Sequence, residues 1–447
     1  MSPRACRSPF ALAATLLCVA ALPASASSGG APVPEKVAAE LVGSLRAARD
    51  RAAPVADLTR RIEQNAVTGL PLLLTILGDE RVPAPADDPE ARVQQLSVVQ
   101  RDMILNALER AGRERVLPST DELFAAAPAA DADFLALQVL GAVGSARDFE
   151  RLLQHALDPD RTLLAERERL AFERAATRML ARDPETYEQL LRHAPNARPE
   201  LLPSLLFAAG AARDPRGLAF VQQVLDRQPD LARIAISQVR LIGPSLSVQR
   251  NEELLRRVRP YLRPEEKETC QAAALALAEL GDAESIPALL ELLEHDSAGI
   301  RENALWALQR ATGMSFPLDA RIWTEWYEGE LAWLADEAPG LIQQLSASDT
   351  SKVAEALKAL TRHRLHRHQL AQRIGDELPR VSDELRVLIC KTLGRLESPY
   401  AIPALLDAAE DRHVPLSIAA FEALLAVTRR DLGRDADTWR AALFAEE

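Results

Sequence analysis

The chain has 447 residues and a formal net charge of −12, and 48% of its residues are hydrophobic while only 4% are aromatic. Ala and Leu dominate the apolar set, which favours helix, whereas the β-branched and aromatic residues that favour strands are sparse. This composition argues against all-β, doubly wound α/β, collagen-like, disulfide-rich and multi-span membrane proteins. The acidic charge argues against binding to nucleic acid or to an anionic membrane.

Residues 1–26 have the pattern of a secretory signal peptide. Arg4 and Arg7 precede an apolar run from Phe10 to Leu22, and Ala24-Ser25-Ala26 supplies a small-residue cleavage site. The run is too short to span a bilayer, and no later apolar stretch reaches the length of a membrane helix. We therefore expect cleavage after Ala26, export to a periplasm or beyond, and no membrane insertion once the leader is removed.

A small-residue linker over 27–33 leads into an irregular helical region, 34–130. Proline and capping residues divide this region into three early helical patterns. These are 34–50, 54–67 and 87–112. The Pro-rich stretch 81–89 is predicted to be a loop.

Internal similarity predicts repeated helical hairpins in the rest of the chain. Residues 286–326 and 402–442 align without a gap at an offset of 116 and share 13 of 41 positions. Weaker copies lie upstream, each with an apolar helix, a turn and a second amphipathic helix. Their turns are predicted at four glycines, which supply the left-handed backbone that ends a helix. They are Gly141, Gly144, Gly210 and Gly281. Units of about 35–45 residues predict one elongated stack of roughly ten to eleven hairpins.

The stretch 274–308, ALALAELGDAESIPALLELLEHDSAGIRENALWAL, resembles a HEAT repeat, particularly the bacterial HEAT-like type also seen in phycobilisome lyases. Its marks are Leu280-Gly281-Asp282, the Ile286-Pro287 pair and Arg301 on the following helix. The repeats are clearer over 264–447 and degenerate over 131–263. The resemblance implies an all-α, armadillo-like α/α superhelix (a solenoid of stacked antiparallel helix hairpins). Such folds mostly bind proteins and share no catalytic residues, so we predict no catalytic, cofactor-binding or metal-binding residue.

Two Asp–Trp pairs recur in the two best copies. Asp319 and Asp435 are placed as N-caps, which puts Trp323 and Trp439 at the fourth helical position. Leu318 is expected to pack on Trp323 as a hydrophobic staple.

The densest aromatic group of the sequence follows the first of these pairs. We expect Trp326 and Tyr327 to be the first candidates for a partner-binding hot spot if they lie exposed beside a groove.

Cysteines and histidines offer little chemistry. Cys270 and Cys390 are 120 residues apart, or about three hairpins, so we expect buried free thiols and no disulfide.

His363, His366 and His368 lie in an arginine-rich run. Three interpretations stay open for that run: a solvated basic turn, which we favour, a metal site, or a basic docking patch.

The main functional hypothesis is an exported, non-catalytic scaffold that binds an unidentified protein or peptide of the cell envelope. It requires no cofactor. The alternative is a ligand-binding or lyase-like enzyme with a pocket in the superhelix. A third possibility is a structural module that shapes a larger assembly.

Overall fold

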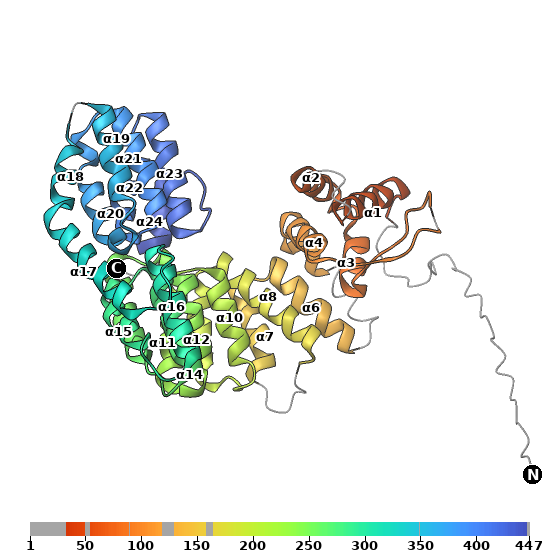
Figure 1. Ribbon diagram of the computed structural model, residues 1–447. Coiled ribbons are helices and arrows are strands. Elements are labelled where there is room, and N and C mark those ends of the chain that lie inside the picture. The colour runs from red at the N-terminus through yellow and green to blue at the C-terminus, as the bar shows by residue number, and fades with distance from the viewer. Residues whose placement is uncertain are drawn as a thin grey trace, which may run out of the picture. The chain divides into compact units, whose positions relative to one another are not determined.

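The computed structural model describes residues 33–49, 54–88, 90–118, 129–157, 164–347 and 349–444. The leader expected over 1–26 lies outside these described residues. The chain divides into two compact units, Met1–Ala136 and Leu137–Glu447, and each is described by itself (Figure 1).

The first unit is a small helical bundle with a minimal β-ladder. Its helices are α1 (Glu35–Arg49), α2 (Val55–Asn65), α3 (Leu70–Asp79) and α4 (Val98–Ala111). Strands β1 (Arg81–Val82) and β2 (Gln94–Gln95) pair antiparallel, with Arg81 opposite Gln95. Helix α1 packs against both α2 and α4.

The helix expected over 87–112 begins only at Val98, so that prediction is wrong in its first half. Ser97 and Gln100 form a capping box, in which each side chain accepts a hydrogen bond from the other residue's backbone N–H. The Gln100 side chain also donates to the Leu45 carbonyl of α1, 2.8 Å away. The cap and this buried bond set the start of α4. The stretch before it forms β2, which pairs with the first residues of the predicted loop.

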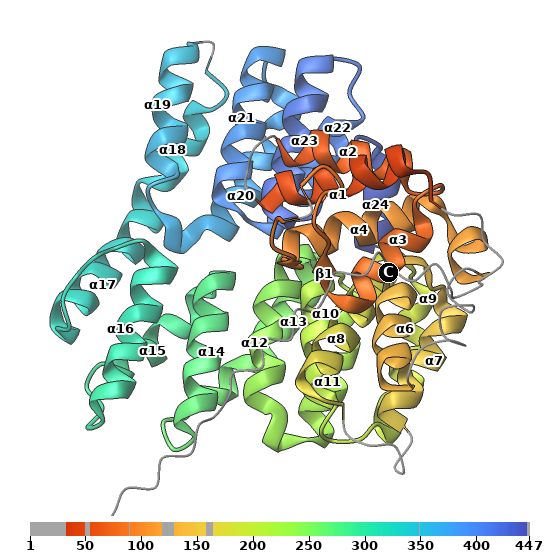
Figure 2. The same ribbon diagram turned by 90° about the vertical axis from the view of Figure 1, so that its right-hand side faces the viewer.

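The second unit is built of stacked antiparallel hairpins in two layers (Figures 1 and 2). In its first part, one layer is a row of helices that contact one another in succession. They are α8 (Glu166–Arg182), α10 (Leu202–Ala212), α12 (Ala232–Ile242), α14 (Lys267–Leu280) and α16 (Ala298–Thr312). The helices of the other layer alternate with them along the chain. They are α7 (Ala146–Leu157), α9 (Glu185–His193), α11 (Gly217–Arg227), α13 (Val248–Val258) and α15 (Ile286–Leu292), and α6 (Ala129–Val143) precedes them.

The C-terminal part of this unit repeats the plan. Its helices are α17 (Ala320–Asp336), α18 (Ala338–Gln344), α19 (Thr350–Leu360), α20 (Arg367–Asp376), α21 (Asp383–Leu396), α22 (Ile402–Ala409), α23 (Val414–Thr428) and α24 (Ala436–Phe444). Single 3-10 turns join many of the helices. They are η1 (Ala194–Asn196), η2 (Pro229–Leu231), η3 (Gly243–Ser245), η4 (Arg259–Tyr261), η5 (Ala283–Ser285), η6 (Arg364–His366), η7 (Leu378–Arg380) and η8 (Pro399–Ala401). The predicted all-α superhelical class is confirmed.

The internal offset of 116 is reproduced helix by helix. Helices α15, α16 and α17 begin 116 residues before α22, α23 and α24. Asp319 accepts hydrogen bonds from the first turn of α17, and Asp435 does the same for α24. The indole N–H groups of Trp323 and Trp439 each donate, over 3.0 Å, to the carbonyl six residues upstream. The predicted caps and their buried tryptophans are therefore confirmed in both copies.

The expected staple is wrong in its partner. Leu318 is 43% exposed. Phe316 packs edge-on against Trp323 instead, with ring centroids 5.1 Å apart. Phe316 lies two residues farther upstream of α17 than Leu318, and this longer connection allows its ring to fold back over the first turn of the helix.

Only one of the four turn glycines has the predicted left-handed backbone. Gly281 ends α14 with φ +77°. Gly141 and Gly210 instead lie inside helices, where a neighbouring helix approaches closely, and Gly144 also lacks a positive φ. A Cβ on Gly141 would lie 2.8 Å from the Ala175 backbone. Gly141 and Gly210 therefore serve close helix packing, whereas Gly144 directly follows α6 and donates its N–H to the Leu140 carbonyl without a left-handed backbone.

The C-terminal hairpins contact residues far upstream as well as their neighbours. The Ser245 hydroxyl donates to the Thr428 carbonyl over 3.2 Å, and Arg430 binds the fully buried Asp214 at 3.2 Å. The blue C-terminal helices accordingly stand beside the green ones in both views (Figures 1 and 2). The elongated stack expected from sequence is thus folded back on itself within the second unit.

Two expectations concern the core and the membrane. Cys270 and Cys390 are both buried and unbridged, as predicted. Across the described ranges, no helix has the length and apolarity required to cross a membrane.

Candidate partner-binding surface

The histidine and arginine run is a buried junction, and its interpretation as a solvated basic turn is wrong. Arg367 is only 3% exposed and donates from Nη2 to the Glu279 carbonyl at the end of α14. His368 donates from Nε2 to the Leu280 carbonyl, and its Nδ1 accepts from the Ser398 hydroxyl at 2.8 Å. These two residues cap the C-terminal carbonyl groups of a helix 88 residues upstream.

Burial determines the charge of each capping group. It lowers the pKa of His368 to about 3, with a further contribution from the neighbouring Arg367, so the imidazole is neutral at pH 7. Burial also lowers the pKa of Arg367, to about 10, which leaves the guanidinium charged at pH 7. A cation is favourable at this position because the carbonyl end of a helix carries partial negative charge.

The other two histidines face α17 rather than a shared metal. His363 lies 3.0 Å from a carboxylate oxygen of Glu330, and its ring stacks on Trp333 at 3.3 Å between centroids. His366 is buried and donates to the Glu330 carbonyl over 3.2 Å, and burial lowers its pKa. Among the described residues, no group of three His, Cys, Asp or Glu side chains is arranged to hold a metal ion.

The aromatic residues singled out from sequence, Trp326 and Tyr327, are half-buried. Trp326 packs edge-on against Trp323 at 5.9 Å and against Phe316 at 6.2 Å. Both residues border the core formed by α14, α15 and α16. Packing inside the hairpin therefore occupies much of their surface.

A different tryptophan is exposed, and sequence reasoning missed it. Trp306 on α16 is 47% exposed. The buried stripe of this helix follows the helical period through Ile300, Ala304, Ala307 and Ala311. Trp306 falls outside that stripe, so the register of the amphipathic pattern contains the signal that it faces outward.

Trp306 borders a hollow of about 410 Å³ between α14 and α16. Gln271 and Leu275 line it from α14, and Glu302 and Asn303 line it from α16. An aromatic face, one aliphatic side chain, two amides and the Glu302 carboxylate surround the same space. This set suits a peptide, since the amides can pair with backbone groups while the apolar surfaces hold a side chain.

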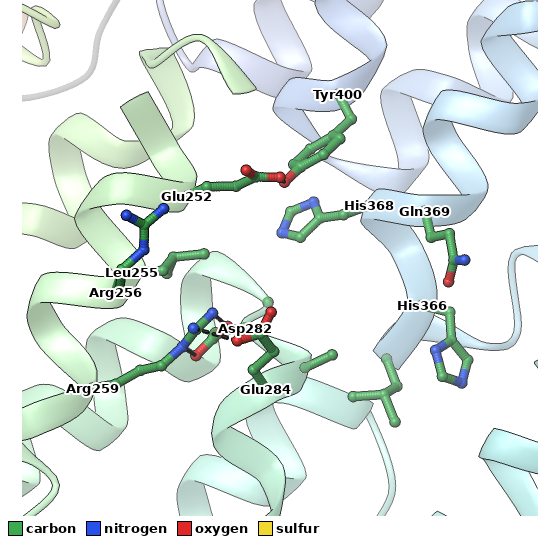
Figure 3. A pocket seen from close by; sticks show the side chains of 13 residues that line it. Glu252, Leu255, Arg256, Arg259, Asp282, Glu284, His366, His368, Gln369 and Tyr400 are labelled. Atoms are coloured by element: carbon green, nitrogen blue, oxygen red, sulfur yellow. Dashed lines mark hydrogen bonds and ion pairs between the residues drawn. The ribbon is translucent and has the colours of Figure 1, made fainter. Parts of the chain in front are cut away.

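A second, polar pocket of about 320 Å³ lies between α13, η5 and η8, beside the capping histidine (Figure 3). Tyr400 donates to Glu252 over 2.8 Å, and His368 stacks on the tyrosine ring at 5.0 Å. Arg259 donates two hydrogen bonds, of 2.8 and 2.7 Å, to the Asp282 carboxylate. These pairs join elements far apart in the sequence. No serine, threonine, cysteine or lysine is among the described residues that line the pocket.

Two layers of antiparallel hairpins define an α/α superhelical repeat protein. The family model described as HEAT repeats matches residues 219–309 of the second unit. No curated protein matches its sequence.

Solved structures offer only distant likenesses. Human deoxyhypusine hydroxylase in complex with glycerol is 16% identical, with 64% of this chain and 97% of that one covered and a TM-score of 0.26. A designed armadillo repeat protein in complex with the peptide (KR)4 is 16% identical, with 63% and 99% covered and a TM-score of 0.21. The karyopherin Kap121p bound to the extreme C-terminus of the phosphatase Cdc14p is 11% identical, with 92% and 51% covered and a TM-score of 0.36. At these TM-scores, the likenesses carry no argument about function.

Proposed function

We propose that the mature chain is an exported, non-catalytic HEAT-repeat scaffold that binds a protein or peptide partner of the cell envelope. The observation that carries the proposal is Trp306, which is 47% exposed beside the hollow between α14 and α16. Tryptophan is enriched at binding hot spots, particularly where it borders a pocket that a partner's side chain can fill. The HEAT repeats are compatible with a protein-interaction scaffold.

Export depends on the signal-peptide pattern of residues 1–26. Expression of the full chain in a bacterial host should yield a periplasmic or secreted protein whose first residue is Ser27. Recovery of an uncleaved cytoplasmic chain would contradict the export part of the proposal and leave partner binding to be judged separately.

For the enzyme alternative, the polar pocket of Figure 3 gathers titratable side chains of the kind that a reaction would require. The best-placed titratable groups of this pocket are already hydrogen-bonded within the protein. Both ring nitrogens of His368 are hydrogen-bonded, and Arg259 donates to Asp282. A residue already engaged in this way is poorly placed to exchange a proton with a substrate. The arrangement favours a structural role for this pocket, which is why the proposal is non-catalytic.

The test compares Trp306→Ala with Phe207→Ala. Phe207 is a matched control because it is 43% exposed on α10, in the same layer as α16 but separated from it by α12 and α14. Immobilised wild-type chain and both variants are incubated with envelope extract, retained proteins are identified by mass spectrometry, and the affinity of the main one is measured in purified form. We expect Trp306→Ala to weaken binding by about 30-fold, the loss typical of a hot spot.

Phe207→Ala should bind within about threefold of wild type, as expected for an exposed residue outside the hot spot. Equal retention by wild type and Trp306→Ala would reject the hollow as the binding site. A wild-type chain that retains nothing above background would reject the scaffold function.

A further inference from the structure

Five arginines gather beside the Trp306 hollow and form what we term the arginine cluster. Its members come from the ends of α12 and α16, from η6, from the start of α20 and from the residue after α23. They are Arg240, Arg310, Arg364, Arg367 and Arg429. Elements more than 180 residues apart thus contribute positive charge to one place, in a chain whose net charge is −12.

Two carboxylates form ion pairs with members of the arginine cluster. Glu279 contacts Arg240 at 3.4 Å and Arg310 at 3.8 Å. Glu397 contacts Arg364 at 3.9 Å and Arg429 at 3.5 Å. Two carboxylates face five guanidinium groups, so they compensate the positive charge of the cluster only in part.

The positive charge is not otherwise neutralised by side chains. Among the described residues, Arg367 forms no ion pair within 4 Å and donates to a backbone carbonyl, and the charge of Glu397, already paired with two other arginines, is the only carboxylate charge that acts on it. The Nε atoms of Arg240, Arg364 and Arg367 are buried and have no hydrogen-bond partner. Helix C-termini explain part of the gathering, since they favour cations. The C-terminal end of α14 accepts a hydrogen bond from Arg367. The side chains of Arg310, Arg364 and Arg429, in contrast, remain about 40% exposed.

The cluster continues the hollow along the same two helices. Arg310 follows Trp306 by four residues on α16, and Glu279 follows Leu275 by four on α14. Residues four apart lie on one helix face, about one turn or 5–6 Å along the axis. An extended segment that places an apolar side chain beside Trp306 therefore brings its next residues to the exposed guanidinium groups.

We propose that the partner segment is acidic: an apolar anchor fills the Trp306 hollow, and neighbouring Asp or Glu side chains bind Arg310, Arg364 and Arg429. This inference rests on the proposed function, because it specifies the partner of the same surface. Guanidinium groups bind carboxylates with paired N–H donors, and an uncompensated cluster attracts an anionic segment from a distance. The exposed arginines provide the binding groups, and the buried Arg367 adds to the field.

The test uses three fluorescent peptides and the purified mature chain. Each peptide has one Leu-Trp anchor followed by four Glu, four Gln or four Lys residues. We expect the Glu peptide to bind about tenfold more tightly than the Gln peptide, since a few exposed ion pairs contribute that much in sum. The Lys peptide should bind more weakly than both. The advantage of Glu over Gln should shrink as salt is raised from 50 to 300 mM.

Two substitutions locate the effect. Arg310→Gln should reduce the preference for Glu over Gln, because it removes one of the three exposed binding groups, whereas Arg310→Lys, which keeps the charge, should retain most of it. Arg256→Gln is the matched control, because Arg256 is exposed on α13 beside the polar pocket and outside the cluster. Its preference should equal that of wild type. Thermal melts of each variant verify that the fold is retained.

The outcomes separate this inference from the proposed function. Equal affinity for Glu and Gln peptides, with both lost in Trp306→Ala, would overturn the acidic preference and leave partner binding at the hollow intact. Binding of none of the peptides would also overturn it, while capture of a native partner would still support the scaffold. A single-stranded oligonucleotide that binds more tightly than the Glu peptide would identify a general polyanion site and overturn the proposal.

Discussion

Gly281→Ala tests whether the contact of Arg367 with the end of α14 holds the folded-back hairpins together. Gly281 has φ +77°, and a Cβ there would lie 2.5 Å from Nε and 2.7 Å from Cζ of Arg367. Arg367 is 3% exposed, and a shift of its guanidinium away from this Cβ moves its Nη2 off the Glu279 carbonyl to which it donates. The substitution therefore strains the backbone and also displaces the cap.

The magnitude follows from two separable costs. A left-handed conformation costs a non-glycine residue about 1–2 kcal/mol. Loss of a hydrogen bond from a charged group adds about 1.5–3 kcal/mol, so the total is about 3–5 kcal/mol. Gly313→Ala is the matched control, because Gly313 has the same φ of +77° at the end of α16, but its Cβ would meet only Arg364 Cδ at an ordinary 3.8 Å. It should cost only the backbone term.

Urea unfolding of the two variants measures the overall costs. Hydrogen exchange measures the local ones, because a long repeat protein need not unfold in a single step. We expect Gly281→Ala to lose protection over 274–282 and 364–370, and Gly313→Ala to keep it in the second segment. Equal free-energy costs for the two variants, or unchanged protection over 364–370 in Gly281→Ala, would refute the argument that Arg367 joins the two parts.

Two further predictions concern the capping histidine and the repeated tryptophans. The pKa of His368 is about 3 in the folded chain and about 6.5 when unfolded, so the unfolded state takes up the proton first as pH falls. The stability that depends on neutral His368 is therefore complete above about pH 6.5 and is lost between pH 6.5 and 3. Melting temperatures should fall less over this range in His368→Gln than in wild type, and identical slopes would contradict this prediction. Trp323→Phe and Trp439→Phe each remove one indole donor to a carbonyl six residues upstream, so each should destabilise by about 1–2 kcal/mol in urea unfolding. A difference above about 2 kcal/mol between them would show that the two copies are not energetically equivalent.

The sequence alone was sufficient wherever the determining interactions are local. The Asp319 cap lies four residues before Trp323, and its copy recurs 116 residues later, so pattern and offset predict both helix starts. Apolar stripes of helical period predict the hairpins for the same reason: neighbouring turns of one helix share a face. The outward position of Trp306 was within reach of this reasoning, because the residue lies outside the buried stripe of its own helix.

Tertiary structure decided what depends on contacts between distant segments. The run around Arg367 looks like a solvated turn because its partners, the carbonyl groups that end α14, are 88 residues away and leave no periodic signal. Trp326 is half-buried because Phe316 happens to pack against it. Local chemistry therefore determined the helices and their caps. The folding back of the hairpins, and with it the arginine cluster, arises from long-range packing that no short pattern encodes.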